Sequence, residues 1–251
     1  MMTEVIEVPA DYEVQRKQHI MKKVKDELKR ISHYTPRVGV FGDTGVGKSS
    51  LCNALFGSDI ARISHVDTCA CEPQEILIGD KNEGGIILVD VPGIGEDTQH
   101  HEEYIHLYEN LIHELDIVLW AIKADDRKYM SSMDVYSRVI EPNLKKCPVV
   151  FAITQTDKIE PYRNWDKKNG KPGEKQMISL RFKINDISSR FNVSTNKIVP
   201  VSSVDTYNLL TLINKVVEML PEEIASLETE YDDEMLMIEQ LETQELEYCI
   251  I

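Results

Sequence analysis

A glycine-rich stretch followed by lysine and serine carries the clearest chemical pattern in this chain. Residues 42–49 read GDTGVGKS, after the apolar run 38–41 and before a helix-like run at 50–56. Glycines let the backbone wrap around a phosphate, and the N–H groups of the loop and helix start point at the anion. We expect Lys48 to reach the β- and γ-phosphates and the Ser49 hydroxyl to ligate Mg²⁺. The pattern predicts binding of a nucleoside triphosphate without saying which one.

An acidic residue ends another apolar run, 42 positions beyond Lys48. The run 86–89 leads into Asp90, and the motif DVPG closes with Gly93. An acidic side chain at the C-terminal end of a strand can bind Mg²⁺, directly or through a water molecule. Gly93 lets its backbone N–H approach the γ-phosphate. We therefore expect Ser49 and Asp90 to form the metal site.

Two later loops carry residue types suited to a purine base. The run 149–153 leads into the motif TQTD, which ends at Asp157. Its carboxylate can accept hydrogen bonds from guanine N1–H and the exocyclic amine, a donor pair that adenine lacks. The run 198–201 leads into Ser202 and Ser203, where a backbone N–H suits guanine O6. These loops favour GTP over ATP, and an ATP-using P-loop enzyme such as a kinase is the weaker rival.

Short β-rich runs alternate with helical runs along the middle of the chain, which is typical of a mainly parallel sheet with helices on both faces. We expect strands at 37–42, 74–79, 86–91, 116–122, 148–154 and 197–201. We expect helices at 48–57, 100–114, 131–140, 174–191 and 205–219. The turn-rich link 80–85 predicts one antiparallel hairpin. The segment 158–175 predicts an exposed loop whose lysines could meet an acidic partner, namely Lys167, Lys168, Lys171 and Lys175.

The charge of the chain is uneven. Its formal net charge is -15, and the stretch 216–251 holds twelve acidic residues and no Lys or Arg, whereas 16–30 holds seven basic residues. Overall acidity argues against DNA binding. Apolar residues at helical spacing predict an N-terminal helix and an acidic C-terminal helix that can pack on the core or self-associate. We therefore divide the chain into an N-terminal helix (1–35), a nucleotide-binding domain (36–220) and a tail (221–251).

Other classes of protein find little support in the sequence. Five scattered cysteines argue against a disulfide framework, and Cys69 and Cys71 lack a second pair at zinc spacing. The apolar run 117–122 is far too short to span a membrane, and the N-terminus has no signal-peptide pattern. We expect a cytoplasmic protein without a transmembrane segment.

The order GDTGVGKS, DVPG, TQTD and VSS resembles the G1, G3, G4 and G5 boxes of Era/TrmE-like P-loop GTPases. The string VLWAIKADDR at 118–127 resembles bacterial Era-like GTPases of unknown role, often labelled 50S ribosome-binding. The resemblance implies an α/β G domain with a six-stranded, mainly parallel sheet. It also implies GTP or GDP with Mg²⁺, and a protein or ribosomal RNA effector. The implied nucleotide contacts are Gly42, Asp43, Thr44, Gly45, Val46, Gly47, Lys48, Ser49, Ser50, Asp90, Gly93, Thr154, Gln155, Asp157, Ser202 and Ser203.

Several positions depart from the family pattern. Thr154 and Gln155 replace the usual Asn and Lys of the G4 box, and the lysine stem normally lies over the base, so we expect weaker affinity. Ile94 stands where Ras-like enzymes place a glutamine that orients water. Gly45 replaces the asparagine that helps hold potassium in related cation-activated GTPases, so we expect no potassium activation by that route.

The largest departure lies in switch I. Relatives carry a threonine whose hydroxyl ligates Mg²⁺, and alignment on the following Glu-Pro pair puts Ala70 there. Thr68 is the nearest hydroxyl, and a shift of register would let it serve. We therefore expect Lys48 and Thr68 as the catalytic residues of a slow or partner-stimulated GTPase. The alternative is a nucleotide-gated binding module with little or no hydrolysis. Three histidines after switch II are interpreted as exposed helix residues rather than bases, namely His100, His101 and His106.

Overall fold

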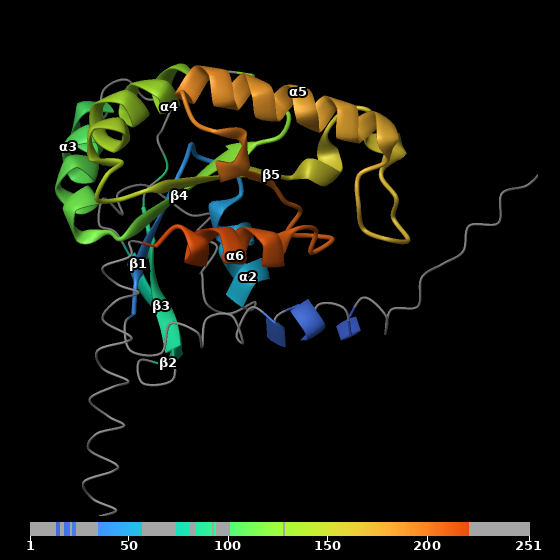
Figure 1. Ribbon diagram of the computed structural model, residues 1–251, viewed down its shortest axis with the longest axis horizontal. Helices are drawn as coiled ribbons and strands as arrows, with labels where there is room; N and C mark the ends of the chain where they lie inside the picture. The colour runs from blue at the N-terminus through green and yellow to red at the C-terminus, as the bar shows by residue number, and fades with distance from the viewer. Residues whose placement is uncertain are drawn as a thin grey trace, which may run out of the picture.

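Six strands form a single mixed sheet in the order β2-β3-β1-β4-β5-β6 (Figure 1). The computed structural model describes residues 14–15, 18–20, 22–23, 35–56, 74–80, 84–91, 93, 101–127 and 129–220. The strands are β1 (Arg37–Phe41), β2 (Gln74–Asp80), β3 (Gly84–Asp90), β4 (Ile117–Lys123), β5 (Val149–Thr154) and β6 (Ile198–Pro200). All neighbouring pairs are parallel except β2 and β3, which confirms the expected antiparallel hairpin.

Helices cover both faces of this sheet. Helices α3, α4 and α5 lie on one face, and α2 and α6 lie on the other (Figure 1). Their bounds are α2 (Lys48–Phe56), α3 (His101–Leu111), α4 (Met130–Val135), α5 (Glu174–Phe191) and α6 (Leu209–Glu218). Shorter 3-10 turns occupy Ile112–Glu114, Glu141–Asn143, Thr156–Lys158, Tyr162–Asn164 and Thr195–Lys197, and Tyr136–Ile140 is π-helical. The predicted fold class is confirmed.

Alternate residues of the central strands pack into two separate hydrophobic cores, one on each face of the sheet. On β4, Trp120 packs beneath α3, α4 and α5, whereas Leu119 packs beneath α2 and α6. On β5, Phe151 and Val150 divide between the cores in the same way. Because helices cover both faces, these strands are apolar up to their last residue rather than alternating between apolar and polar residues.

Aromatic side chains fill the centre of the core beneath α5. Phe191 at the end of α5 is 2% exposed, and its ring centroid lies 5.1 Å from that of Phe151 and 5.2 Å from that of Tyr136. The Trp120 ring lies 6.3 Å from Phe191 and 5.9 Å from Phe41. Tilted and edge-on contacts of this kind add to the gain from burial. The end of α5 thereby packs directly on β4 and β5, and Trp120 continues the aromatic contacts to β1.

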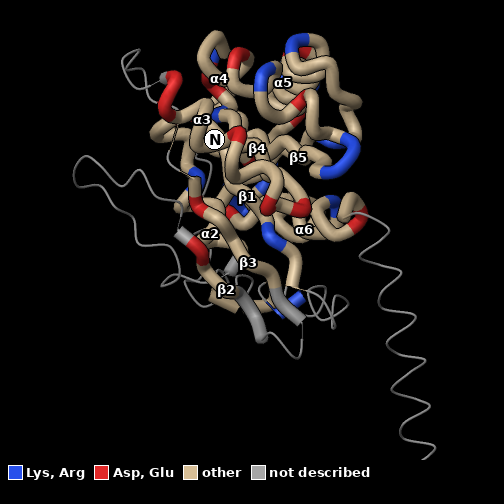
Figure 2. Tube along the Cα trace, turned by 90° about the vertical axis from the view of Figure 1, so that its left-hand side faces the viewer, with Lys and Arg blue, Asp and Glu red and all other residues tan. Residues whose placement is uncertain are grey.

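Two predicted segments differ from what the structure shows. The last helix begins at Leu209 rather than 205, because a bridge between Ser202 and Tyr207 and left-handed backbone at Asn208 (φ 56°) hold the preceding residues in turns. The segment 158–175 is more ordered than a plain loop, since it holds a short bridge between Asp166 and Lys171. Its lysines are exposed, and Figure 2 shows basic residues gathered before α5.

The flanking segments are described only in small part. Ile20 packs against the core formed by α2 and α6, so at least this point of the N-terminal segment touches the domain. The tail 221–251 lies outside the described residues, and the three-part division of the chain stays a prediction. No helix in the described part has the length and apolar character needed to cross a membrane.

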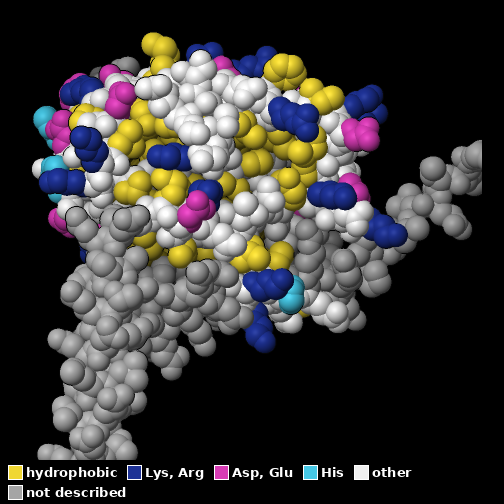
Figure 3. All heavy atoms as spheres, in the orientation of Figure 1, with side chains coloured by type: hydrophobic (Ala, Val, Ile, Leu, Met, Phe, Trp, Pro, Cys, Tyr) yellow, Lys and Arg dark blue, Asp and Glu magenta, His cyan; other side chains and the backbone are white. Residues whose placement is uncertain are grey.

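Helix α5 carries apolar residues on its outward face as well as on its buried face. Phe182 is 71% exposed and Ile178 is 53% exposed, and hydrophobic side chains lie between basic ones where α5 forms the upper edge in Figure 3. These two side chains add little to the core, in contrast with Leu180 and Phe191 on the buried face.

Two phenylalanines of α5 therefore provide a matched test of the packing. We expect Phe191→Ala to lower the free energy of unfolding by about 3–5 kcal/mol, because it removes a fully buried ring from the aromatic core. Phe182→Ala should change it by about 0.5 kcal/mol or less. Urea unfolding followed by circular dichroism measures both. Equal losses for the two variants would contradict the assignment of the faces.

A buried lysine ties α5 to the segment after β4. Lys183 donates hydrogen bonds to the Asp126 carbonyl and the Tyr129 hydroxyl, and its ammonium lies 4.7 Å from the centre of the Tyr129 ring. Burial lowers the pKa of Lys183 to about 8, although the charges of Asp126 and Asp186 oppose the shift. The charged form of Lys183 is therefore less stable in the folded protein than in the unfolded chain.

The sign of this pKa shift predicts a pH effect on stability. Between pH 8 and 10.5 the unfolded chain binds more protons at Lys183 than the folded chain does, so stability should rise with pH. Relative to Lys183→Met, which cannot titrate, the wild type should gain about 1 kcal/mol of unfolding free energy from pH 7.5 to 9.5. Parallel denaturant titrations at several pH values measure the difference. A constant difference would show that burial does not shift this pKa.

Candidate functional site

The loops that follow four parallel strands meet at one edge of the sheet. In a parallel sheet the carboxyl ends of neighbouring strands lie together, which is where open α/β folds bind ligands. Val40 of β1 is in register with Asp90 of β3, and Ile153 of β5 is in register with Pro200 of β6. The predicted phosphate loop, the predicted metal ligand Asp90 and the two predicted base loops therefore all lie at the same edge of the sheet.

Three glycines shape the loop between β1 and α2. Gly42, Gly45 and Gly47 have φ angles of 140°, 79° and 93°, in a region that other residues rarely adopt. A Cβ on Gly42 would lie 2.4 Å from the carbonyl oxygen of Ala121 on β4. At the far end, Leu51 N–H donates to the Gly47 carbonyl at 2.9 Å and starts α2. Glycine is thus required where the loop leaves the sheet.

Lys48 and Asp90 lie close enough for the charge of each to act on the other. The Lys48 ammonium donates to the carbonyls of Gly42 (3.0 Å) and Asp43 (3.2 Å). Burial lowers the pKa of Lys48, and the charges of Asp90 and Asp43 oppose that shift. Burial likewise raises the pKa of Asp90, and the Lys48 charge opposes it. Each group therefore stabilises the charged form of the other.

Gly93 brings the DVPG segment against the phosphate loop. A Cβ at this position would lie 2.8 Å from both the Lys48 ammonium and the Thr44 hydroxyl. Any larger residue would displace the lysine or the loop. The structure therefore places Gly93, Lys48 and Asp90 together, and Ser49 follows Lys48 in the first turn of α2.

The base loop begins with a threonine that reaches the phosphate loop. The Thr154 hydroxyl donates to the Val46 carbonyl at 2.6 Å and lies 3.3 Å from the Ile122 carbonyl. Thr154 is 1% exposed and Val46 is 3% exposed, so both ends of the 2.6 Å bond are shielded from water. The next residue, Gln155, has left-handed backbone with φ 54°. Thr154, which departs from the family pattern, is therefore an anchor between two loops.

Asp157 is held by the loop after β6. Its carboxylate accepts a hydrogen bond of 2.7 Å from the Ser202 hydroxyl. Backbone bonds of 3.2 and 3.0 Å join Ser202 to Tyr207, and the Tyr207 ring meets Trp165 edge-on at 5.8 Å. Ser203 lies in the turn beside Ser202. The acid and the serine loop are thus brought together, and their contacts with guanine stay a prediction.

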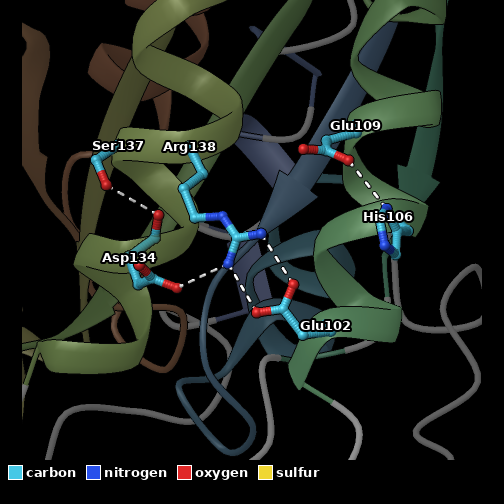
Figure 4. A network of polar contacts seen from close by, with 6 residues as sticks. All are labelled: Glu102, His106, Glu109, Asp134, Ser137 and Arg138. Carbon is cyan, nitrogen blue, oxygen red and sulfur yellow. Dashed lines mark hydrogen bonds and ion pairs between the residues drawn. The ribbon is translucent and has the colours of Figure 1, made fainter.

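One polar contact connects α4 to the phosphate loop, and a second connects the π-helical segment after α4 to α3. The Ser132 hydroxyl donates to the Asp43 carboxylate at 2.8 Å, which ties α4 to the phosphate loop. Arg138 forms a two-point contact with Glu102 of α3, at 2.8 and 2.9 Å, and lies 3.6 Å from Asp134 (Figure 4). In the same view His106 pairs with Glu109. His106 is largely exposed, which confirms its reading as a surface helix residue.

The comparisons with known proteins agree with this geometry. Residues 37–155 match the family described as 50S ribosome-binding GTPase. YkfA of Escherichia coli (strain K12), named as uncharacterized, is 41% identical over 146 residues, which cover 57% of this chain and 50% of YkfA. GTPase Era of Aquifex aeolicus (strain VF5) is 29% identical over 192 residues, or 74% of this chain and 56% of Era.

A solved structure extends the agreement to three dimensions. Era in complex with MgGDPNP and nucleotides 1506–1542 of 16S ribosomal RNA superposes with a TM-score of 0.55 at 25% identity, over 74% of this chain and 57% of that one. Residues 37–155, which match the family model, form a P-loop GTPase domain that is similar to Era. The chain spans about half the length of the curated relatives it matches.

The donor set of the GTPase domain suits Mg²⁺ once phosphates are present. The described residues contain no cluster of three or more His, Cys, Asp or Glu side chains that could hold a metal ion. Magnesium sites in such proteins use one or two protein oxygens and complete their shell with phosphate and water oxygens. The Ser49 hydroxyl in the first turn of α2 and the Asp90 carboxylate at the end of β3 are oxygen donors of that kind. They are the residues that would hold the ion.

Some predicted residues lie outside the described part of the chain. Thr68, Ala70, Ile94 and His100 are among them, so the switch I expectations stay predictions, and the side chain of His101 is likewise not described. Conversely, sequence reasoning missed Ser132, Lys158 and Tyr207. A serine in a helix and a lysine in a loop give no signal by themselves. The departure at Gln155 was the one clue, because an unusual residue invites a search for a compensating neighbour.

The anchoring role of Thr154 is open to a direct test. Thr154→Val keeps the shape of the side chain but leaves the buried Val46 carbonyl without this donor, which costs about 1–3 kcal/mol of stability. We expect a lower melting temperature and at least a several-fold loss of GDP affinity, measured by thermal unfolding and fluorescent-nucleotide titration. Ser137→Ala, which removes an exposed hydroxyl bonded to the Asp134 carbonyl, is the control. An unaltered Thr154→Val protein would refute the anchor.

Proposed function

We propose that this chain is a guanine-nucleotide switch that binds GTP with Mg²⁺ and hydrolyses it slowly to GDP and phosphate. One observation carries the proposal. Lys48, the Asp90–Gly93 segment and the Asp157–Ser202 pair lie at the same edge of the sheet, with the phosphate loop bonded to the base loop. That spacing suits a ligand with phosphates at one end and a base at the other. We also propose a cytoplasmic location, in line with the Era relatives.

Each residue has a separate task under this proposal. Lys48 neutralises the β- and γ-phosphates, and the loop N–H groups hold their oxygens. When bound, Mg²⁺ offsets the negative charge that develops on the phosphates, with Ser49 and Asp90 as its protein ligands. Asp157 accepts the two guanine donors, and the Ser202 bond fixes the direction of its carboxylate. Gly93 lets backbone approach the γ-phosphate.

Slow turnover is proposed from two sequence positions. Ala70 cannot ligate Mg²⁺ as the usual threonine does, and Ile94 cannot orient an attacking water. Thr68 is the nearest hydroxyl for a shifted switch I. A partner can supply the missing groups, as GTPase-activating proteins do. Since Era has been solved with 16S ribosomal RNA, an RNA or protein effector is proposed here too. A pull-down with GTP-locked and GDP-loaded protein would identify it.

Nucleotide choice and turnover should respond separately to two substitutions. Lys48→Ala should abolish measurable binding of GTP and GDP. Asp157→Asn should shift preference from guanosine to xanthosine nucleotides, because an amide can donate to the carbonyl that xanthine has in place of the amine. Competition titrations with GDP, ADP and xanthosine diphosphate measure both effects. If ADP competed as well as GDP, the role of Asp157 would be wrong.

Single-turnover hydrolysis distinguishes the enzyme from its alternative. We expect phosphate release from bound GTP to exceed the Lys48→Ala background while staying well below one turnover per second, the lower end of ordinary enzyme rates. Tight binding with no release, even when a partner is added, would instead support a binding module gated by the nucleotide.

A further inference from the structure

A second lysine stands beside the position where the usual base loop has its lysine. Gln155 replaces that residue, and the Lys158 ammonium donates to the Gln155 side-chain oxygen at 2.9 Å. The contact follows from local backbone geometry. The left-handed conformation of Gln155 and the 3-10 turn Thr156–Lys158 bring the two side chains onto one side, and Lys158 N–H also donates to the Gln155 carbonyl at 2.9 Å.

The same hydrogen bond orients the Gln155 amide toward the phosphate loop. An amide has one acceptor oxygen and one donor nitrogen, so a cation on the oxygen turns the nitrogen away. A Cβ built on Gly47 would lie 3.5 Å from that nitrogen, which places it against the loop backbone. The Gln155 side chain therefore lies between Lys158 and the phosphate loop.

The backbone that carries Lys158 is held on both sides. Thr156 N–H donates to the Val201 carbonyl at 3.2 Å. The carbonyl of Ile159, a residue that is 6% exposed, accepts a hydrogen bond of 2.9 Å from the buried Gln176 side-chain amide. Between these two backbone contacts, the Asp157 carboxylate accepts a hydrogen bond from the Ser202 hydroxyl. Lys158 thus projects from a fixed turn, which lowers the entropy cost of holding its side chain near Gln155.

We propose that Lys158 is a positioning residue for the guanine nucleotide, which together with Gln155 replaces the single lysine of the usual base loop. Gln155 supplies the side chain between the base loop and the phosphate loop. Lys158 supplies the positive charge and fixes the orientation of the amide. Neither acts in bond cleavage. The inference rests on the proposed function, since it concerns the affinity of the same site.

Dissociation of fluorescent GDP from the full-length protein tests the proposal. Lys158→Met keeps the apolar stem but removes the donor, and we expect about 5- to 10-fold faster dissociation with weaker affinity to match. Lys158→Arg should retain affinity within about threefold, because a guanidinium also donates to the amide oxygen. Lys168→Met removes an exposed lysine of the neighbouring loop and should change nothing. The melting temperature of nucleotide-free protein should be the same for all three.

A double-mutant cycle adds a readout that a purely structural lysine would not move. Gln155→Lys restores the lysine of the usual base loop, so Lys158→Met should have little further effect on GDP dissociation in that background. If Lys158→Met has the same effect with either residue at 155, or behaves like Lys168→Met while the wild type binds GDP, the positioning role is wrong and the proposed function stands. If the wild type itself binds no guanine nucleotide, the proposed function fails instead.

Discussion

The hydrogen bond from the Thr154 hydroxyl to the Val46 carbonyl sets the distance between the two loops that a nucleotide must span. It joins the end of β5 to the phosphate loop across 108 residues of sequence, and Thr154 is buried. The backbone continues the link, because Ala124 N–H donates to the Thr154 carbonyl at 3.0 Å. A short, water-excluded bond of this kind is costly to break, since the carbonyl would be left without a partner. Phosphate and base recognition therefore share one rigid frame.

Helix α4 and the π-helical segment that follows it connect that frame to α3. Ser132 bonds to Asp43 in the phosphate loop, and Arg138 bonds to Glu102 at the start of α3. Both contacts lie within two turns of helix, and the π-helical segment Tyr136–Ile140 carries Arg138. The exposed Arg138 pair contributes little to stability by itself. Its consequence is geometric, because a shift of α3 after nucleotide exchange would pull on a helix already fixed to the phosphate loop.

Patterns of residue type were enough to predict the sheet, the hairpin and the grouping of the site. Long apolar runs such as that of β4 report a strand covered on both faces, and α5 was predicted with its observed bounds. The start of α6 was predicted four residues early, because apolar periodicity does not reveal the Ser202–Tyr207 bridge. Likewise, the sequence alone indicates only that Thr154 departs from the usual base box and weakens nucleotide affinity. Its hydroxyl has a partner 108 positions away, and such long-range contacts leave no local signal.

The electrostatics of Lys48 and Asp90 link phosphate binding to metal binding. Burial disfavours the charge on both groups, and each is kept charged mainly by the other. A triphosphate beside Lys48 adds negative charge, which strengthens the charged form of the lysine and works against the carboxylate of Asp90. A divalent cation reverses the effect on Asp90. Under the proposed function, nucleotide and Mg²⁺ should therefore each bind better in the presence of the other, and this coupling comes from two neighbouring strand ends rather than from a preformed metal cage.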